Sequence, residues 1–259
     1  MIYVSINFGI YLKKIRLNFN LINREDALGK VVGIIGGMGP ESTIRLMDKI
    51  VGYTPITREQ DHLRMIVDNN PGIPDRTEFL LGIGPSPVPM LIESAQLLEN
   101  AGANFIAIPC NTAHAFIREI QKVVNIPVLD MLALTADSLG RQFPPGNTFL
   151  LLTTSGSLSV NLFQKYLNHF RLKVPGPEQQ NLIMEIIYGK SGVKCDGSNQ
   201  TNSMKLKKVM KDLIEPDLSG IIAGCTEISL ILTDKIFDLP VIDPLDVLAR
   251  EIVSRAKMD

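Results

Sequence analysis

Two cysteines stand at places in the chain where a thiol can do chemistry. Cys110 ends the apolar segment FIAIPC, and Cys225 ends the apolar segment GIIAGC, and both segments are typical of strands buried on both faces of a parallel sheet. Asn111 and Thr112 follow the first thiol, and Thr226 follows the second. Ligands bind beyond the carboxyl ends of parallel strands, so both thiols are expected at a binding site. One could remove a proton from a small molecule while the other delivers one, which inverts a stereocentre.

A helix is expected to begin directly after each of these cysteines. Asn111 or Thr112 could cap the first helix, and Thr226 could cap the second, with Glu227 in its first turn. The positive end of a helix favours a thiolate and would lower the cysteine pKa from about 8.5 to roughly 7 or below. A proton shuttle needs a pKa near the working pH, so this shift would suit the proposed chemistry.

The remaining sequence alternates between strand patterns and helix patterns from residue 30 onward, which predicts an α/β fold with mostly parallel sheets flanked by helices. One expected helix, 40–53, carries Ile44, Met47, Ile50 and Val51 at helical spacing. The expected strands are 31–37, 63–70, 103–110, 126–131, 147–157, 218–225 and 239–244; the other expected helices are 89–102, 112–124, 159–170, 226–232 and 247–256.

The pattern occurs twice. Gly36 precedes Cys110 by 74 residues and Thr154 precedes Cys225 by 71, and an aspartate follows each cysteine after 20 and 18 residues. We therefore expect two similar α/β halves, related by a pseudo-two-fold axis, with the site in the cleft between them. Their expected ranges are 30–143 and 144–244, with a C-terminal helix (245–259) that returns to the first half and an N-terminal extension (1–29) that is poorly ordered.

Composition excludes several classes of function. The net charge is −1 and no basic stripe occurs, so no nucleic-acid partner is expected. The apolar runs of the extension are too short and too interrupted by Lys and Arg to span a membrane, and they do not resemble a signal peptide. Three cysteines form no disulfide framework, which indicates a reducing cytoplasmic location. Cys195 lies in a hydrophilic stretch and is expected to be an exposed bystander.

Two loops could stabilise negative charge beside the thiols. The turn GGMGPEST could expose the backbone N–H groups of Gly36, Gly37 and Gly39 to an anion, but it is not a dinucleotide-binding pattern. The segment TTSGS (153–157) offers hydroxyl groups and a second set of N–H groups. His114 is expected near the site or on a helix face. Neither it nor the pair at 61–62 has the spacing of a metal site, so no metal is predicted.

Several long motifs, in order, resemble the aspartate/glutamate racemase superfamily, specifically its PLP-independent aspartate racemases. They are GIIGGMGPEST, DNNPGIPDRT, IPCNTAHAF, LLTTSGS, IIAGCTEISLIL and PVIDPLDVLA, and the likeness runs from about Gly33 to Ala256. The resemblance implies cofactor-independent racemisation of aspartate by two catalytic cysteines, Cys110 and Cys225, with no metal, and it implies a homodimer.

The resemblance also implies a set of substrate contacts. Asn111, Thr112 and Thr226 would hold the α-carboxylate and amino groups, Met38 and Thr154 would line the pocket, and Glu227 belongs to the same set. Arg76 would grip the side-chain carboxylate through its guanidinium fork. A lysine after IYG would assist; Lys194 matches best and Lys190 is the alternative, and the Asn/Ser-rich stretch after Lys194 is interpreted as a loop that could form a lid.

Other functions remain open at this point. The substrate range could extend to glutamate or other acidic amino acids. A maleate isomerase, a hydantoin racemase or a decarboxylase could use the same scaffold, although a decarboxylase needs only one thiol. A non-catalytic two-lobed binding protein is the remaining alternative, and thiols have no purpose in an inert binder.

Overall fold

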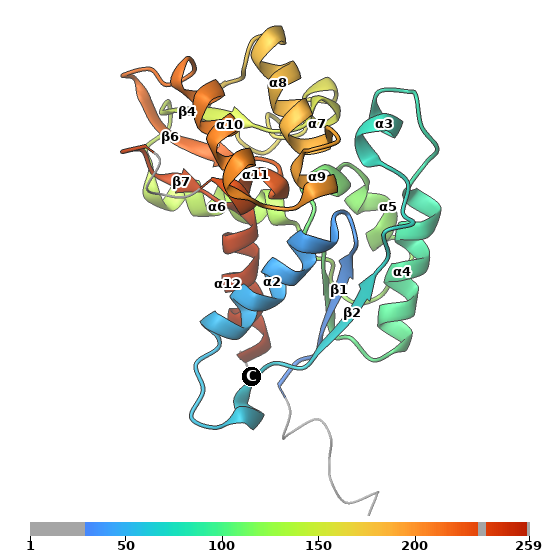
Figure 1. Ribbon diagram of the computed structural model, residues 1–259. Helices are drawn as coiled ribbons and strands as arrows, with labels where there is room; N and C mark the ends of the chain where they lie inside the picture. Colours follow the sequence, from blue (N-terminus) through green and yellow to red (C-terminus); the bar gives the residue numbers. More distant parts are fainter. Residues whose placement is uncertain (1–28, 233–236, 258–259) are drawn as a thin grey trace, which may run out of the picture.

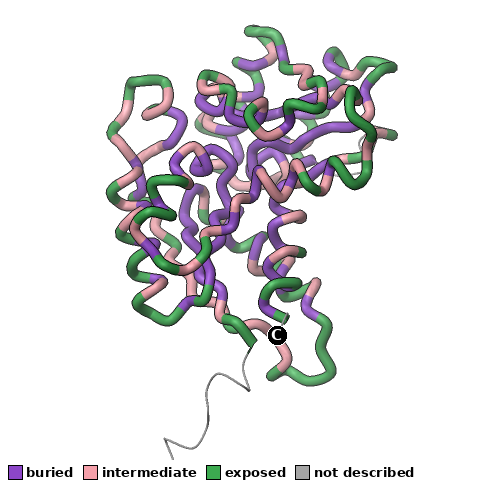
Figure 2. Tube along the Cα trace, turned by 180° about the vertical axis from the view of Figure 1, so that it is seen from behind, coloured by how far each residue is buried: buried purple, intermediate pink, exposed green. Residues whose placement is uncertain are grey.

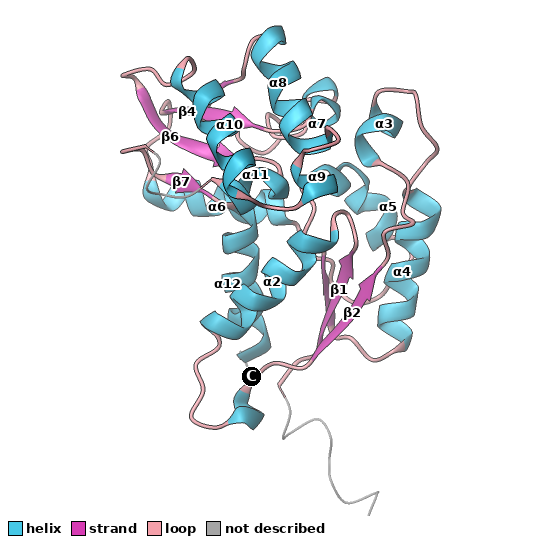
Figure 3. Ribbon diagram, in the orientation of Figure 1, coloured by secondary structure: helices cyan, strands magenta, loops and turns pink. Residues whose placement is uncertain are grey.

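The computed structural model describes residues 29–232 and 237–257, which form two α/β halves joined side by side (Figure 1). The predicted fold class is confirmed: each half has a parallel sheet with helices on its faces (Figure 3). The predicted N-terminal extension lies outside the described residues, apart from Gly29.

The first half is built on a three-stranded parallel sheet in the order β2-β1-β3. Strands β1 and β3 are buried apolar runs, whereas the edge strand β2 is only partly buried. The elements of this half are β1 (Val32–Gly36), α2 (Pro40–Tyr53), η1 (Glu59–Asp61), β2 (Met65–Asn69), α3 (Arg76–Leu80), α4 (Val88–Asn100), β3 (Phe105–Ala107), η2 (Thr112–Phe116), α5 (Ile117–Gln121) and α6 (Met131–Gln142).

The second half is built on a four-stranded parallel sheet in the order β5-β4-β6-β7. Its central strands, β4 and β6, are each buried at every residue but one. Figure 2 shows buried residues of the chain in purple. The elements of this half are β4 (Thr148–Leu152), α7 (Ser155–Ser159), β5 (Arg171–Lys173), α8 (Pro177–Tyr188), α9 (Val193–Asp196), α10 (Gln200–Lys211), β6 (Leu218–Ala223), α11 (Thr226–Ile231), β7 (Val241–Ile242) and α12 (Pro244–Lys257).

The two sheets have the same strand order once one short contact is included. A single bridge joins Ile106 to Val128 at the edge of the first sheet, in the place that β7 takes in the second. The predicted strand 126–131 is therefore wrong in extent. Pro127 lacks an N–H group and cannot continue a ladder, so only its carbonyl and the N–H of Leu129 pair with Ile106.

The last helix of each half packs against the other half. Leu132 and Leu139 of α6 lie in a buried cluster with Phe149 and Leu151 of the second sheet. In return, α12 runs down beside α2 in Figure 1, and its apolar face joins the cluster around Val32 of the first sheet. Each half thus needs a helix from the other to complete its core, and α6 and α12 also pack on one another.

Helix α2 buries only part of the face expected. Ile50 is buried and Met47 packs against the core, but Ile44 and Val51 are 65% and 46% exposed, and Thr43 and Leu46 are buried instead. Thr43 lies against Gly36 of β1, and its hydroxyl oxygen accepts a hydrogen bond from the backbone N–H of Gly37 at 3.0 Å. This close approach turns the smaller side chains toward the sheet and leaves the two β-branched apolar residues outside.

Three helix predictions require correction. The expected helix 159–170 is absent, because Asn161 takes a left-handed conformation (φ 51°) that ends the short helix α7. The expected helix 112–124 begins as the 3₁₀ turn η2 and continues as the short α5. The stretch after Lys194 is helical instead of a loop, since Asn199 caps α10 by accepting from the Asn202 N–H. Helices α6, α8 and α9 were not expected.

Packing of α12 predicts a large effect on stability. Replacing Leu248, which is fully buried, with Ala is expected to lower the free energy of unfolding by about 2 to 5 kcal/mol, because the first half loses apolar contacts and gains a cavity. Ile44→Ala is the control, and its effect is expected to stay within about 0.5 kcal/mol. Urea unfolding curves measure both; equal effects of the two substitutions would contradict this account of the packing.

Candidate active site

A small cavity lies between the carboxyl ends of the two sheets. Its volume is about 10 Å³, which is room for about one water molecule. All ten site residues expected from the sequence line it, together with Tyr188, which was not expected. The lining residues are Met38, Arg76, Cys110, Asn111, Thr112, Thr154, Tyr188, Lys194, Cys225, Thr226 and Glu227.

Cys110 is held at the end of the β3 segment by a buried histidine. The imidazole of His114 lies 2.9 Å from the carbonyl oxygen of Cys110 through Nδ1 and 3.1 Å from the N–H of Met131 through Nε2. Because the Met131 N–H is the donor, Nε2 must accept and Nδ1 must carry the hydrogen that goes to Cys110. His114 therefore fixes the backbone at this thiol to the start of α6, and it does not line the cavity.

Asn111 does not act as the expected helix cap. Its side chain makes no capping bond, and both its Oδ1 and Nδ2 atoms are buried without a hydrogen-bond partner. Thr226 also makes no capping bond, and Cys225 itself is the N-cap residue of α11. Buried polar atoms without partners are rare in native proteins, so the amide of Asn111 marks a place where a polar ligand would fit.

Arg76 is buried at the start of α3, where Asp75 caps the helix. Its guanidinium donates to the carbonyl oxygens of Ile73, Pro74 and Met38 at 3.0 to 3.2 Å. These bonds use three of the five N–H groups of an arginine, and Nε has no partner. Two donors are left to face the cavity and Cys110.

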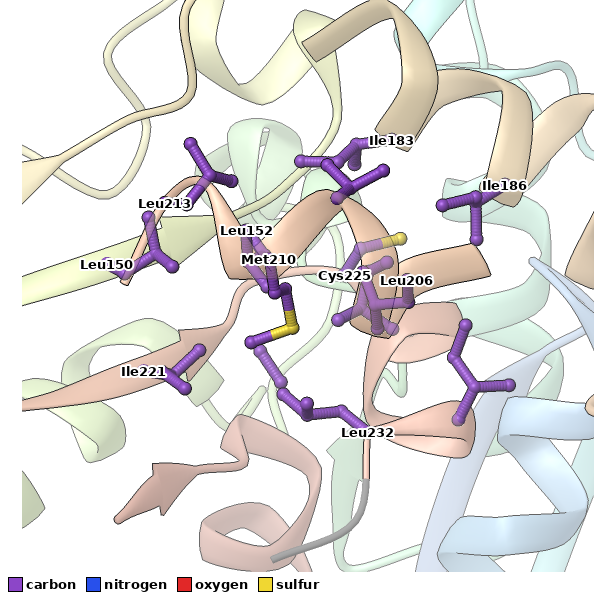
Figure 4. Close-up of a cluster of buried hydrophobic side chains, with 14 of the residues drawn as sticks. Leu150, Leu152, Ile183, Ile186, Leu206, Met210, Leu213, Ile221, Cys225 and Leu232 are labelled. Carbon is purple, nitrogen blue, oxygen red and sulfur yellow. The ribbon is translucent and has the colours of Figure 1, made fainter. Parts of the chain in front are cut away.

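Cys225 follows β6 and is bonded to a carboxylate. Its sulfur lies 2.9 Å from Oε2 of Glu227, which also accepts from the hydroxyl of Thr226 at 3.2 Å. On the other carboxylate oxygen, Oε1, Glu227 accepts from Lys194 at 3.1 Å and from the backbone N–H of Gly39 at 3.2 Å. Cys225 belongs to a cluster of buried apolar side chains that includes Leu206 and Ile186 (Figure 4).

The glycine turn after β1 therefore binds a carboxylate of the same chain, that of Glu227. Glu227 takes the N–H of Gly39, and the N–H of Gly37 is bonded to Thr43, so the turn offers fewer free donors than expected. In the second loop, the hydroxyl groups of Thr112, Thr154 and Ser157 bond to one another at 3.0 to 3.2 Å. These bonds join the two halves beside the cavity.

Lys194 reaches the cavity, and Lys190 does not. Lys194 binds Glu227 and the carbonyl oxygen of Met38 at 3.3 Å, whereas the side chain of Lys190 is exposed. Tyr188 lies under Lys194, with its ring centroid 5.1 Å from Nζ, and its hydroxyl bonds Thr77 at 3.1 Å. Tyr188 is the tyrosine of the IYG motif, so its place in that motif was the sequence signal that could have identified it.

This chain matches one protein-family model over most of its length. The model is that of the Asp/Glu/Hydantoin racemases, and the match covers residues 35–252.

The chain belongs to the Asp/Glu/hydantoin racemase family.

Relatives with known names agree with this assignment. Among solved structures, the aspartate racemase of Picrophilus torridus is 31% identical with a TM-score of 0.78, over 88% of this chain and 94% of that one. An aspartate racemase homologue from Pyrococcus horikoshii OT3 has a TM-score of 0.67 at 24% identity, over 88% of this chain and all of that one, and shows the shared fold. The broad specificity amino-acid racemase RacX of Bacillus subtilis (strain 168) is 27% identical over 232 residues, which are 86% of this chain and 97% of that one. The predictions of the family and of an amino-acid racemase are confirmed.

The electrostatics of this racemase site differ from the sequence expectation at Cys225. Burial and the adjacent Glu227 carboxylate raise the pKa of the Cys225 thiol well above its ordinary value, although Lys194 opposes them. The expected lowering by the helix end is therefore wrong for Cys225, because burial and, after it, the carboxylate two residues into the helix outweigh the effect of the helix end. Burial raises the pKa of Glu227, but Lys194 and the hydrogen bond from Cys225 lower it by more. The net shift of this pKa is downward, so Glu227 remains a carboxylate.

Two cations are retained at the site. Burial lowers the pKa of Arg76, but Cys110 and Asp75 outweigh burial and the net shift is upward. Burial also lowers the pKa of Lys194, and Glu227 more than restores it. The site thus holds two positive side chains and one carboxylate within one enclosed space.

Other features of the described residues lie away from this cavity. An open groove of about 1240 Å³ runs between α6 and α12, and neither cysteine lines it. Cys195 is exposed, as expected, and its thiol is free. Among residues 29–232 and 237–257, no group of His, Cys, Asp and Glu could hold a metal ion, and no helix is long and apolar enough to cross a membrane. Asp61 caps the turn η1 by bonding Thr57 and Arg58.

Stability should depend on pH through His114. Burial lowers the pKa of His114, so the unfolded chain binds this proton more readily than the native state does. His114→Gln is expected to lower the free energy of unfolding by about 1 to 3 kcal/mol near neutral pH, where a buried donor and acceptor lose a partner. The deficit should shrink as the pH falls below about 6.5, the pKa of an unfolded histidine.

Urea unfolding between pH 5 and 8 measures this dependence. His169→Gln, at an exposed position, is the control and should leave the stability curve in place. A deficit for His114→Gln that is constant with pH would contradict the neutral buried state.

Proposed function

We propose that this racemase interconverts L- and D-aspartate without a cofactor, with Cys110 and Cys225 exchanging the proton at Cα from opposite sides. The observation that carries the proposal is that thiols from two similar halves line one enclosed cavity between the ends of their sheets. One cysteine, as a thiolate, takes a proton from Cα and becomes a thiol, while the other, as a thiol, gives a proton to the opposite face and becomes a thiolate. No electron transfer is involved.

The polar groups of the cavity suit a dicarboxylic amino acid. Arg76 keeps two N–H donors and has no carboxylate closer than Asp75, at 3.9 Å, so its charge is available for an incoming carboxylate. Lys194 supplies a second positive charge. The unpartnered amide of Asn111 can accept from an ammonium group and donate to an α-carboxylate.

Broad specificity is the second candidate, because the Bacillus subtilis relative bears that name. The Picrophilus torridus relative, at higher identity, is named an aspartate racemase, which favours aspartate. Chiral chromatography of the products from each proteinogenic amino acid distinguishes the two. Turnover confined to aspartate supports the first proposal, and comparable turnover of neutral amino acids replaces it with the second.

We also propose a cytoplasmic location and a homodimer for this enzyme. The free, buried thiols of Cys110 and Cys225 support a reducing compartment. The dimer follows from the family resemblance and is measured directly by sedimentation.

Both thiols should be necessary. Cys110→Ser and Cys225→Ser are each expected to reduce racemisation by at least about 10²-fold, because each change removes an acid–base group. The measurement is the loss of optical rotation together with deuterium incorporation at Cα in heavy water. Cys195→Ser is the matched control and should retain full activity. Deuterium exchange that survives in both single variants would count against the mechanism.

Lys194, and not Lys190, should support substrate binding. Lys194→Met is expected to lower kcat/KM for aspartate by about 10- to 100-fold, the loss expected for one charge-assisted hydrogen bond. Lys190→Met, four residues earlier and exposed, should change it less than about twofold. Steady-state rates at fixed pH and ionic strength give both values. A larger loss in the Lys190 variant would reverse the assignment.

A further inference from the structure

Glu227 is a buried carboxylate at the meeting point of four donors. Its side chain is 4% exposed, and it accepts from Cys225, Thr226, Lys194 and the backbone of Gly39. An ionised carboxylate can only accept hydrogen bonds. The contact of 2.9 Å between the Cys225 sulfur and Oε2 is therefore an S–H···O bond, and the hydrogen belongs to the sulfur.

The charged and titratable groups around Cys225 favour the same protonation state. Glu227 on α11 is in direct contact with the sulfur, whereas Lys194 on α9 is bonded to the far oxygen of that carboxylate. The phenol of Tyr188 on α8 also faces the thiol, and burial and Asp75 raise the pKa of this phenol. Cys225 also belongs to a cluster of buried apolar side chains that includes Leu206 and Ile186. A thiolate here would lie next to a carboxylate in a water-poor space.

Cys110 has the opposite kind of neighbour. The buried Arg76 guanidinium lines the same cavity as this thiol, and its positive charge interacts with Cys110. No carboxylate bonds to the Cys110 sulfur among the described residues, whereas Cys225 has one. The two halves thus place their thiols in corresponding positions but give them neighbours of opposite charge.

We propose that Glu227 is a positioning residue that holds the proton on Cys225, so that the free enzyme presents Cys225 as the proton donor. The part concerning turnover rests on the proposed racemase function. In one turnover, the Cys110 thiolate takes the Cα proton of one enantiomer and the Cys225 thiol gives its proton to the other face. Cys110 is then a thiol and Cys225 a thiolate beside Glu227, and proton exchange with water restores the first state.

The direct test is a titration of Cys225 alone. In the background Cys110→Ser/Cys195→Ser, the thiolate absorbance in the far ultraviolet is followed against pH, and the same variant with Cys225→Ser is subtracted to remove the tyrosine signal. Adding Glu227→Gln is expected to move the absorbance step to lower pH, since the amide keeps the side-chain shape and removes the charge. Glu41→Gln is the control: Glu41 also links the two halves, by binding Ser198, but contacts no thiol. It should leave the step in place.

A second variant guards against loss of folding. Glu227→Gln leaves Lys194 buried without its partner, which is a destabilising change. Glu227→Gln/Lys194→Met removes both charges, and its step should also move to lower pH, because the carboxylate and not the ammonium contacts the sulfur. A step that stays at its original pH in a folded Glu227 variant would overturn the proposal.

Kinetics separate this role from a structural one. Enantiomers have equal free energies, so kcat/KM must stay equal for the two directions in every variant at every pH. If Glu227 sets the resting protonation state, Glu227→Gln should change kcat unequally in the two directions, with a loss of about 100-fold in the slower one. Equal losses in both directions, with an unmoved titration step, would assign Glu227 to structure alone. Should the wild-type enzyme racemise no amino acid while the step still moves, the proposed function fails and the protonation of Cys225 stands.

Discussion

A carboxylate that is removed from water must be surrounded by donors, and Glu227 imposes this requirement on the whole site. Its donors come from both halves: Gly39 from the turn after β1, and Cys225, Thr226 and Lys194 from the second half. Satisfying the carboxylate therefore brings the two halves into contact. The same bonds set the position of Lys194 and the proton on Cys225. Closure of the cleft and the acid–base state of one thiol thus have a common cause.

The duplicated topology makes the two thiols equivalent in position but not in chemistry. Each cysteine follows a central strand of its sheet, and the residue two positions later points toward the cleft. In the first half that residue is Thr112, which bonds the hydroxyls of Thr154 and Ser157; in the second it is Glu227. In a racemisation, one proton leaves one face of Cα and another arrives at the opposite face. One cysteine must then be a thiolate while the other is a thiol, and unlike surroundings favour these unlike protonation states. The divergence of the two halves at this position supplies that difference.

The sequence located most of the strands and ten of the residues that line the cavity. Parallel strands buried on both faces are nearly continuous apolar runs, so the segments that end in Cys110 and Cys225 could be located directly. Their convergence followed from the rule that ligands lie beyond the carboxyl ends of such strands. Arg76 and Lys194 do not follow strands, and the family resemblance alone indicated that they would line the same cavity.

Features that depend on contacts between distant segments were not predictable. The pKa of Cys225 is raised by burial and by the turn of the Glu227 side chain toward the thiol; the sequence placed Glu227 in the first turn of the helix but showed neither effect. The exposure of Ile44 results from the close approach of Thr43 to Gly36. Helix α7 ends at Ser159, and the chain does not continue as a helix because Asn161 has a left-handed backbone. Asparagine tolerates this conformation but does not require it.

The narrowness of the cavity has a consequence for how catalysis is timed. A space of about 10 Å³ is too small for any amino acid, so the proposed reaction requires the two halves to part at bonds that join them, such as Tyr188 to Thr77 and Ser198 to Glu41. In that reaction, closing these bonds around the substrate would exclude bulk water, and the carbanion at Cα would be protonated by sulfur before solvent could reach it.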